Sequence, residues 1–208
     1  MKNRILGAFL GMSLVAVSFL AAPSFAEPRP DLDARIWEAK EVLKEIMIAP
    51  DQSIPEELLA KCKAIAIYPS VLKGGFIFSA RWGRGVVLKR DEVTGKWGPV
   101  AFSTIGGGGW GLQIGGSATD LILVILNERG MKGLLSNNVT LGAGADVAAG
   151  PVGRASEAST DLTLRAGIFS YSRSRGLFAG IALDGAMLTQ DNNSNTAYYG
   201  KSVTSRDI

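Results

Sequence analysis

The chain has 208 residues, 47% of them hydrophobic, with one cysteine, no histidine and a formal net charge of +3. The lack of histidine excludes Ser-His-Asp and Cys-His catalysis and histidine-ligated zinc or haem, and one cysteine cannot form an intramolecular disulfide. The small net charge gives no support to nucleic-acid binding.

Residues 1–26 have the pattern of a cleavable signal peptide. Lys2 and Arg4 precede an uncharged apolar run, and Ser24 and Ala26 place small residues at the positions that a signal peptidase reads. The run contains a GxxxG pair that would suit an uncleaved, dimerising segment, but it is short for a membrane span. We therefore expect cleavage after Ala26 and export, to the periplasm or cell envelope if the source is bacterial.

Two helices are predicted at the start of the mature chain. Apolar residues recur at helical spacing from Leu32 to Met47, with Asp31 as the expected N-cap. The polar face of this helix carries charges of both signs, so we expect it to pack on the core rather than lie on a membrane. The capping-box pattern Ser53-Ile-Pro-Glu56 predicts a second, short helix through about Lys61.

Strand patterns dominate from Ala64 onward. Apolar residues among glycines predict a hairpin, with Gly83 and Gly85 marking a bend or bulge in its second strand. The continuous apolar run over 121–126 predicts a strand covered on both faces, and a short helix is expected near 128–135.

Three further strand regions are predicted within 139–149, 162–171 and 177–187, with turn signals between them and over 191–195. Helices before strands indicate an α+β fold. We expect N-terminal helices packed on a curved, mostly antiparallel β-sheet or a partly closed barrel, with the one short helix inserted near 128–135. The length suits a single domain over 27–208, divided into a helical lead-in over 31–61 and a β-rich core over 64–200.

Charge is distributed unevenly along the mature chain. Residues 27–60 carry a formal charge of −5, residues 61–98 carry +6, and residues 99–208 carry 0. The middle segment is therefore a candidate anion site. Its cations are Lys61, Lys63, Lys73, Arg81, Arg84, Lys89, Arg90 and Lys96. Cations near an anionic bilayer contribute about 1 kcal/mol each and tryptophan favours the interface, so Trp82 and Trp97 are candidate membrane-interface residues.

The orientation of these cations decides whether they act together. On one straight strand Arg81 and Lys89 face opposite to Arg84 and Arg90, and only a bend at the strand glycines brings all four together. The alternative is a solvated sheet edge whose charges protect it from aggregation. A second, smaller cluster surrounds a predicted hairpin turn. It either extends the first patch or keeps that turn soluble, and we favour the second interpretation. Its members are Arg165, Tyr171, Arg173 and Arg175.

Three weaker signals are interpreted as structural. Gly106, Gly108 and Gly111 match G-x-G-x-x-G, but no amphipathic helix follows to bind a phosphate, so a sheet bend is preferred. Asp120 is expected at the start of a strand, bonded to local backbone. Asp146 is expected in a turn or an ion pair.

No catalytic, metal or cofactor residue is assigned. Arg154 is the candidate ion-pair partner for Asp146. Cys62 lies between Lys61 and Lys63, which would favour the thiolate if the side chain were exposed, but a buried, inert cysteine is the commoner outcome and is expected here.

Several segments together resemble the SYLF domain family. They begin near Leu58 and include Ala64-Ile-Ala-Ile-Tyr-Pro69, Gly74-Gly-Phe-Ile-Phe78, the stretches 120–135 and 141–154, and Tyr198-Tyr-Gly200. SYLF domains are lipid-binding modules of bacterial envelope proteins and, beside SH3 or FYVE domains, of eukaryotic phosphoinositide-binding and actin-patch proteins.

The resemblance implies a non-enzymatic protein that binds anionic phospholipid through the basic-aromatic face of residues 61–98. The head group would be phosphoinositide-like, or phosphatidylglycerol or cardiolipin in a bacterial envelope. Two alternatives remain open: an envelope scaffold that binds a protein partner, and a carrier in which the curved sheet encloses a small anionic ligand. Actin is not expected as a partner, because an exported chain does not meet cytosolic actin.

Overall fold

The structure is a computed structural model that describes residues 27–49, 53–75, 78–110, 115–136, 138–143, 145–152, 166–174, 176–181, 183, 185–205 and 207–208. The predicted signal peptide over residues 1–26 lies outside the described residues, as do Gly111, Arg154, Arg165 and Arg175.

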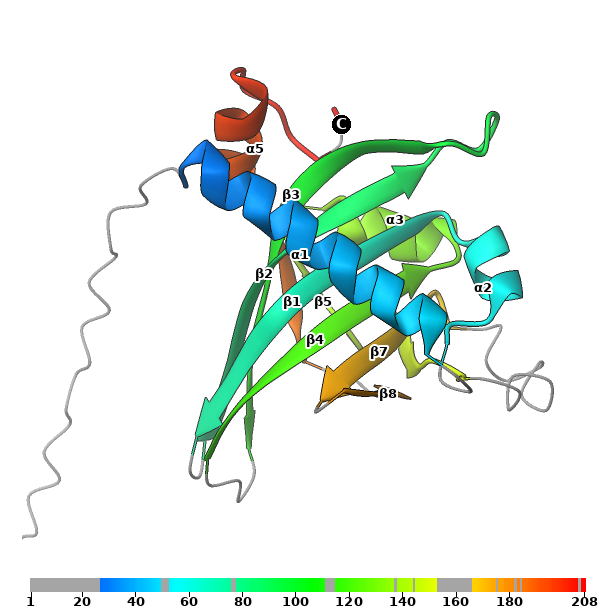
Figure 1. Cartoon of the computed structure of the whole chain (residues 1–208), viewed down its shortest axis with the longest axis vertical. Helices are drawn as coiled ribbons and strands as arrows, with labels where there is room; N and C mark the ends of the chain where they lie inside the picture. Colours follow the sequence, from blue (N-terminus) through cyan, green and yellow to red (C-terminus); the bar gives the residue numbers. More distant parts are fainter. Residues whose placement is uncertain are drawn as a thin grey trace, which may run out of the picture.

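The described residues form an α+β fold, as the sequence predicts (Figure 1). The helices are α1 (Arg29–Ile48), α2 (Glu56–Lys61), α3 (Glu128–Leu134) and α5 (Asn192–Tyr199). The strands are β1 (Ala64–Gly75), β2 (Phe78–Arg90), β3 (Trp97–Trp110), β4 (Gly115–Ile125), β5 (Asn138–Thr140), β6 (Val147–Ala149), β7 (Ile168–Ser174), β8 (Leu177–Gly180) and β9 (Met187–Gln190).

The strands form one curled sheet in the order β5-β9-β3-β2-β1-β4-β7-β6, with β8 paired to β7. Among the described pairings, β6 with β7 is parallel and the others are antiparallel. The expectation of a curved, mostly antiparallel sheet is therefore confirmed.

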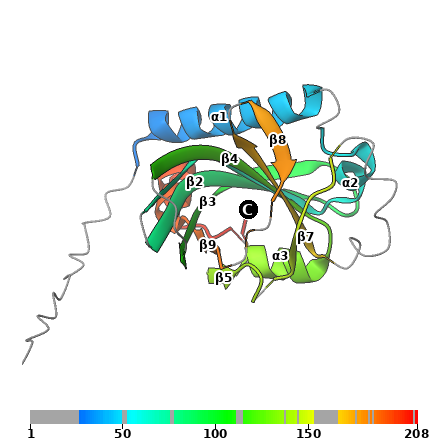
Figure 2. The same cartoon turned by 90° about the horizontal axis from the view of Figure 1, so that it is seen from below.

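Both faces of the sheet are covered, which explains the continuous apolar run in β4. Leu123 and Ile125 belong to the core on the side of α3, whereas Ile122 and Val124 belong to the core under α1. Each of these side chains is almost fully buried and contributes about 1.5–3 kcal/mol to stability. Figure 2 shows α1 crossing the outer side of the curl and α3 lying on its inner side.

The strand glycines do not bend β2, contrary to prediction. β2 stays in continuous register with β3 from Phe78 to Leu88, and the bulge lies instead in β1, between Ile67 and Leu72. A Cβ on Gly85 would lie 2.2 Å from the Ile67 carbonyl oxygen. Gly85 is therefore needed because the bulged part of β1 approaches β2 closely at this position. The side chains of β2 still alternate between the two faces of the sheet.

Proline, rather than a polar cap, precedes each of the first two helices. α1 begins at Arg29 after Pro28, so Asp31 lies within the first turn, and α2 follows Pro55 without a side-chain cap. The predicted caps at Asp31 and Ser53 are therefore wrong. The φ of Pro28 is −59° and that of Pro55 is −56°, so the ring sets the chain direction where each helix starts.

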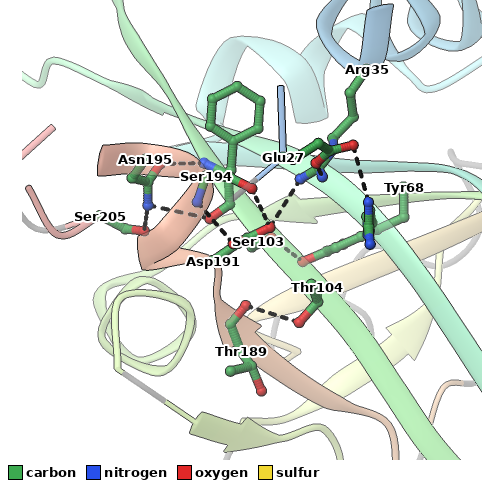
Figure 3. A network of polar contacts seen from close by, with 12 residues as sticks. Glu27, Arg35, Tyr68, Ser103, Thr104, Thr189, Asp191, Ser194, Asn195 and Ser205 are labelled. Carbon is green, nitrogen blue, oxygen red and sulfur yellow. Dashed lines mark hydrogen bonds and ion pairs between the residues drawn. The ribbon is translucent and has the colours of Figure 1, made fainter. Parts of the chain in front are cut away.

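The helix α5 was missed, because its sequence was interpreted as a turn. Asp191 is the N-cap, and its side chain accepts a hydrogen bond from Ser194 N at 3.1 Å. The buried Asn195 side chain accepts a hydrogen bond from Phe102 N in β3 at 2.7 Å (Figure 3). The helix is polar and is held by this tertiary contact, so it has little of the apolar periodicity that predicts helices.

A buried ionic contact fixes α1 relative to α5. Arg35 on α1 is 5% exposed and is paired with Asp191 at 3.2 Å and with Glu27 (Figure 3). Glu27 also pairs with Arg84 of β2 at 3.0 Å. A buried guanidinium needs such partners, because an unpaired charge in the interior is strongly destabilising. The contact thus sets where α1 crosses the sheet.

Candidate functional site

The predicted basic-aromatic face is divided between the two sides of the sheet. Lys73 lies opposite Arg81 on neighbouring strands, and Leu72 lies opposite Trp82 on the other side. Because β2 alternates without a bend, Arg81 and Lys89 lie on the inner side, whereas Trp82, Arg84 and Arg90 lie on the outer side. The structure does not bring the four β2 cations onto one face.

The predicted residues also lie at two ends of the long strands (Figure 1). The hairpin end comprises Lys73, Arg81, Trp82 and Arg84. The α2 end comprises Lys61, Lys63, Lys89, Arg90, Lys96 and Trp97. Trp82 and Arg90 are eight residues apart on β2, which corresponds to about 26 Å at about 3.3 Å per residue.

At the hairpin end, charged and apolar groups lie on opposite sides of the sheet. Lys73 and Arg81 have no ion pair among the described residues. Trp82 is 49% exposed and packs under Arg84, whose guanidinium lies 5.1 Å from the ring centre. Arg84 is already paired with Glu27. This end therefore offers an exposed tryptophan whose neighbouring cation is neutralised.

At the α2 end, Arg90 is held in place by main-chain carbonyl groups. Its Nε donates to Gly95 O at 2.8 Å, and its Nη1 donates to Ala60 O at 2.7 Å and Leu59 O at 3.3 Å. Its guanidinium lies 5.9 Å from the ring centre of Trp97, which is 44% exposed. Arg90 has no carboxylate partner among the described residues, so it is an oriented cation without a counter-charge.

The lysines of the α2 end differ in their pairing. Lys63 contacts Glu128 and Glu92, and these hydrogen bonds raise the pKa of its ammonium group above the ordinary value. Lys61, Lys89 and Lys96 are exposed and have no ion pair in the part of the chain that the structure describes. Four of the five cations at this end therefore lack a carboxylate partner.

Two hollows meet at the α2 end. The apolar hollow has a volume of about 450 Å³, within the range of about 300–1,000 Å³ typical of ligand sites. It is lined by Leu43, Met47, Leu59, Ala60, Ile65, Leu88, Arg90 and Trp97. The polar hollow, of about 280 Å³, is lined by Ala60, Lys61, Cys62, Lys63, Arg90, Asp91, Glu92 and Gly95. Ala60 and Arg90 border both.

The apolar wall of this site was not predicted from the sequence. Leu43 and Met47 come from α1, which was expected to pack on the core, whereas Leu59 of α2 and Leu88 of β2 were given no role. The available signal was weak, since helical spacing marks a residue as facing inward but does not show that its neighbours leave a space.

The remaining candidates have structural roles. Cys62 is 2% exposed and donates to Leu59 O, and burial raises the pKa of its thiol, which confirms the inert interpretation. Asp120 lies within β4 rather than at its start, so that placement is wrong. Its carboxylate accepts a hydrogen bond from Ser70 N at 2.9 Å, in the β1 bulge, where Ser70 has a φ of 51°.

The second cluster is partly described. Arg173 is paired with Asp120 at 2.6 Å and with Glu45 of α1, so it links β4, β7 and α1 rather than serving a free turn. Tyr171 is buried and donates to Pro151 O. Asp146 pairs with Arg129 at 3.5 Å, a partner that was not predicted.

Gly106 and Gly108 lie within β3 and not in a loop that opens a helix, which excludes the phosphate-loop alternative for these two residues. The described residues contain no cluster of acidic or cysteine side chains placed to hold a metal. None of the helices described is long and apolar enough to span a bilayer.

Fold and site together define a small α+β domain whose candidate site is an amphipathic surface at one end of a curled sheet. Residues 106–208 match the Ysc84 family, described as Las17-binding protein actin regulator. The chain belongs to this family, which is the SYLF family that the sequence resembles.

Animal and yeast proteins are similar to the chain. SH3 domain-containing YSC84-like protein 1 of Rattus norvegicus is 39% identical over 160 residues, 76% of this chain and 46% of that protein. The Xenopus laevis protein of the same name is 36% identical, over 82% of this chain and 52% of that protein. Protein YSC84 of Saccharomyces cerevisiae is 35% identical, over 76% of this chain and 34% of that protein.

The chain therefore spans about half the length of its vertebrate relatives and about a third of the yeast protein. LAS seventeen-binding protein 3 of yeast is 34% identical over 161 residues and is named for a protein partner. The expectation that actin is not a partner receives no support from the family description.

Proposed function

We propose that the protein is a non-enzymatic, peripheral binder of anionic phospholipid that docks through its α2 end. The observation that carries the proposal is Arg90, an oriented cation without a carboxylate partner among the described residues, beside the half-exposed Trp97. Lys61, which lines the polar hollow together with Arg90, and Lys96, in the turn between β2 and β3, lie at the same end, whereas Lys89 lies on the inner side of the sheet. Cations at an anionic surface contribute about 1 kcal/mol each, and tryptophan favours the interface.

The hairpin end is a less favourable docking surface, because a docking surface needs unpaired cations and an exposed tryptophan on the same side of the sheet. Its two unpaired cations, Lys73 and Arg81, lie on the inner side of the sheet, whereas its exposed Trp82 lies on the outer side. A flat bilayer contacts one side at a time. Docking through the α2 end therefore brings more uncompensated charge to the same surface as a tryptophan.

Export is part of the proposal and is supported by the sequence pattern of residues 1–26. The lipid would then be an envelope phospholipid such as phosphatidylglycerol or cardiolipin, and a phosphoinositide-like head group if the chain works elsewhere. Peptide mapping of protein recovered from its native source tests export: an N-terminus at Glu27 supports it, and recovery of residues 2–26 in the mature protein overturns it.

A protein partner is the second candidate function. Its support is the family description and the yeast relative named for binding Las17. Whether this chain binds such a partner, actin or an envelope protein is tested by pull-down. A complex that resists both high salt and detergent favours a protein partner, because electrostatic lipid docking is screened by salt.

Co-sedimentation with vesicles tests the lipid proposal. We expect binding to phosphatidylglycerol vesicles at low salt, loss at high salt, and no binding to phosphatidylcholine vesicles. Lys61→Glu combined with Lys96→Glu should reduce binding about tenfold or more, since two attractive charges become repulsive. The control, Lys73→Glu with Lys201→Glu, makes the same change in net charge at the hairpin end and after α5. Equal loss in both double variants overturns docking through the α2 end.

A further inference from the structure

We propose that the α2 end binds one lipid molecule, with its acyl chain in the apolar hollow and its anionic head group in the polar hollow. The inference rests on the proposed lipid-binding function and names its ligand: a single-chain anionic amphiphile such as a fatty acid or lysophospholipid. Its basis is the junction of the two hollows at Ala60 and Arg90.

The apolar hollow suits a hydrocarbon chain. Its walls come from the last turns of α1, from α2 and from β1, β2 and β3, and Arg90 is the one charged residue among those that line it. Met47 and Trp97 border it and are both more than a third exposed. Apolar side chains left open to water around a concave site mark a place where an apolar ligand is bound.

Arg90 is placed to receive the head group. Three carbonyl contacts fix its Nε and Nη1, and its Nη2 has no hydrogen bond within the described residues. A guanidinium held in this way has little conformational freedom left to lose when a carboxylate or phosphate binds. Its position on the border of both hollows puts its charge where an acyl chain would meet its head group.

The acidic residues of the polar hollow do not neutralise this charge. Hydrogen bonds from Thr94 and Val93 lower the pKa of the Asp91 carboxyl group and keep it ionised, but it forms no ion pair with Arg90 among the described residues. The cations that line this hollow, Lys61, Lys63 and Arg90, outnumber its carboxylates, Asp91 and Glu92. Glu92 is paired with Lys63. Lys61, by contrast, lines the hollow without an ion pair among the described residues. The charge left for a ligand is therefore positive, which favours an anionic amphiphile over a neutral one.

Titration calorimetry with dodecanoate and with 1-dodecanol, each below its aggregation concentration, tests the inference on the full chain. We expect one dodecanoate per chain. Ala60→Trp fills the shared border of the hollows from an exposed position and should weaken binding about tenfold or more. Ala34→Trp, at an exposed position on α1, is the matched control and should bind as the wild type does.

The Arg90→Gln variant tests the head-group assignment. It should weaken dodecanoate binding about tenfold or more and leave dodecanol binding unchanged, because only the former needs the charge. Its thermal unfolding is measured alongside. Equal dodecanoate affinity in wild type and Ala60→Trp overturns the inference. If wild type binds anionic vesicles but not dodecanoate, the single-lipid site fails and the proposed function stands; if it binds neither, the proposed function fails as well.

Discussion

The guanidinium of Arg90, the last residue of β2, lies 5.9 Å from the centre of the ring of Trp97, the first residue of β3. The strand register places the two residues opposite each other, and the carbonyl groups of α2 hold the cation in this position. An aromatic ring and an unneutralised cation thus share one exposed corner, where α1, α2 and the sheet meet.

Replacing Trp97 by alanine should weaken binding to anionic vesicles more than replacing Trp82. Trp97 borders the apolar hollow beside Arg90, whereas Trp82 lies about 26 Å away along β2. We expect the vesicle partition coefficient to fall about fivefold, a change of about 1 kcal/mol, in Trp97→Ala, because the variant lacks the exposed ring that favours the bilayer interface. A larger loss in Trp82→Ala would move the docking surface to the hairpin end.

Gly85→Ala should destabilise the fold, whereas Gly106→Ala should not. The added Cβ at Gly85 meets the Ile67 carbonyl oxygen at 2.2 Å, but at Gly106 its nearest neighbour is Arg81 O at 3.9 Å. Overpacking of this kind costs about 1–3 kcal/mol or more, against about 0.5 kcal/mol or less for the control. Urea unfolding measures the stability of the two variants. Equal midpoints would show that the β1 bulge adjusts to the added Cβ without loss of stability.

Asn195→Ala should destabilise the protein by about 1–3 kcal/mol, because it leaves the buried Phe102 N–H without its acceptor. Asn192→Ala, on the exposed side of the same helix, controls for the change in helix propensity. Hydrogen exchange of the Phe102 amide provides a local measurement. Unchanged protection of that amide in Asn195→Ala would show that α5 does not depend on this contact.

The protein should lose stability as the pH rises above about 10. Burial raises the pKa of the Tyr68 hydroxyl well above its ordinary value of 10.0, and the same cause raises the pKa of Tyr171. Above pH 10 the unfolded chain releases protons that the folded chain retains, so unfolding is favoured by about 1.4 kcal/mol per pH unit for each group.

Tyr68→Phe removes one of these groups and its hydrogen bond to Ser103. Its stability should be lower than that of the wild type at pH 8, but should fall less steeply between pH 10 and pH 11. Urea titrations at each pH give the two slopes. Parallel slopes would mean that Tyr68 ionises in the folded state as readily as in the unfolded one.

Elements with strong local signals were predictable. The uninterrupted apolar run of β4 indicated burial on both faces, and the short helix expected near 128–135 is α3, where the Asn127 side chain accepts from Gly130 N as the N-cap. The caps at Asp31 and Ser53 failed because proline set the helix starts. α5 escaped prediction because its anchor, the Asn195 contact with Phe102, joins residues 93 apart in the chain.

The sequence by itself determined the α+β class, the position of the core strands and the types of residue that carry charge over 61–98, because periodicity and composition are local properties. Tertiary structure alone decided which of those residues work together. The bulge lies in β1, so β2 keeps its alternation and separates Arg81 from Arg84. The packing of α1 and α2 against the sheet then leaves a hollow beside Arg90, a feature that depends on unfilled space between distant segments and has no signature in any one of them.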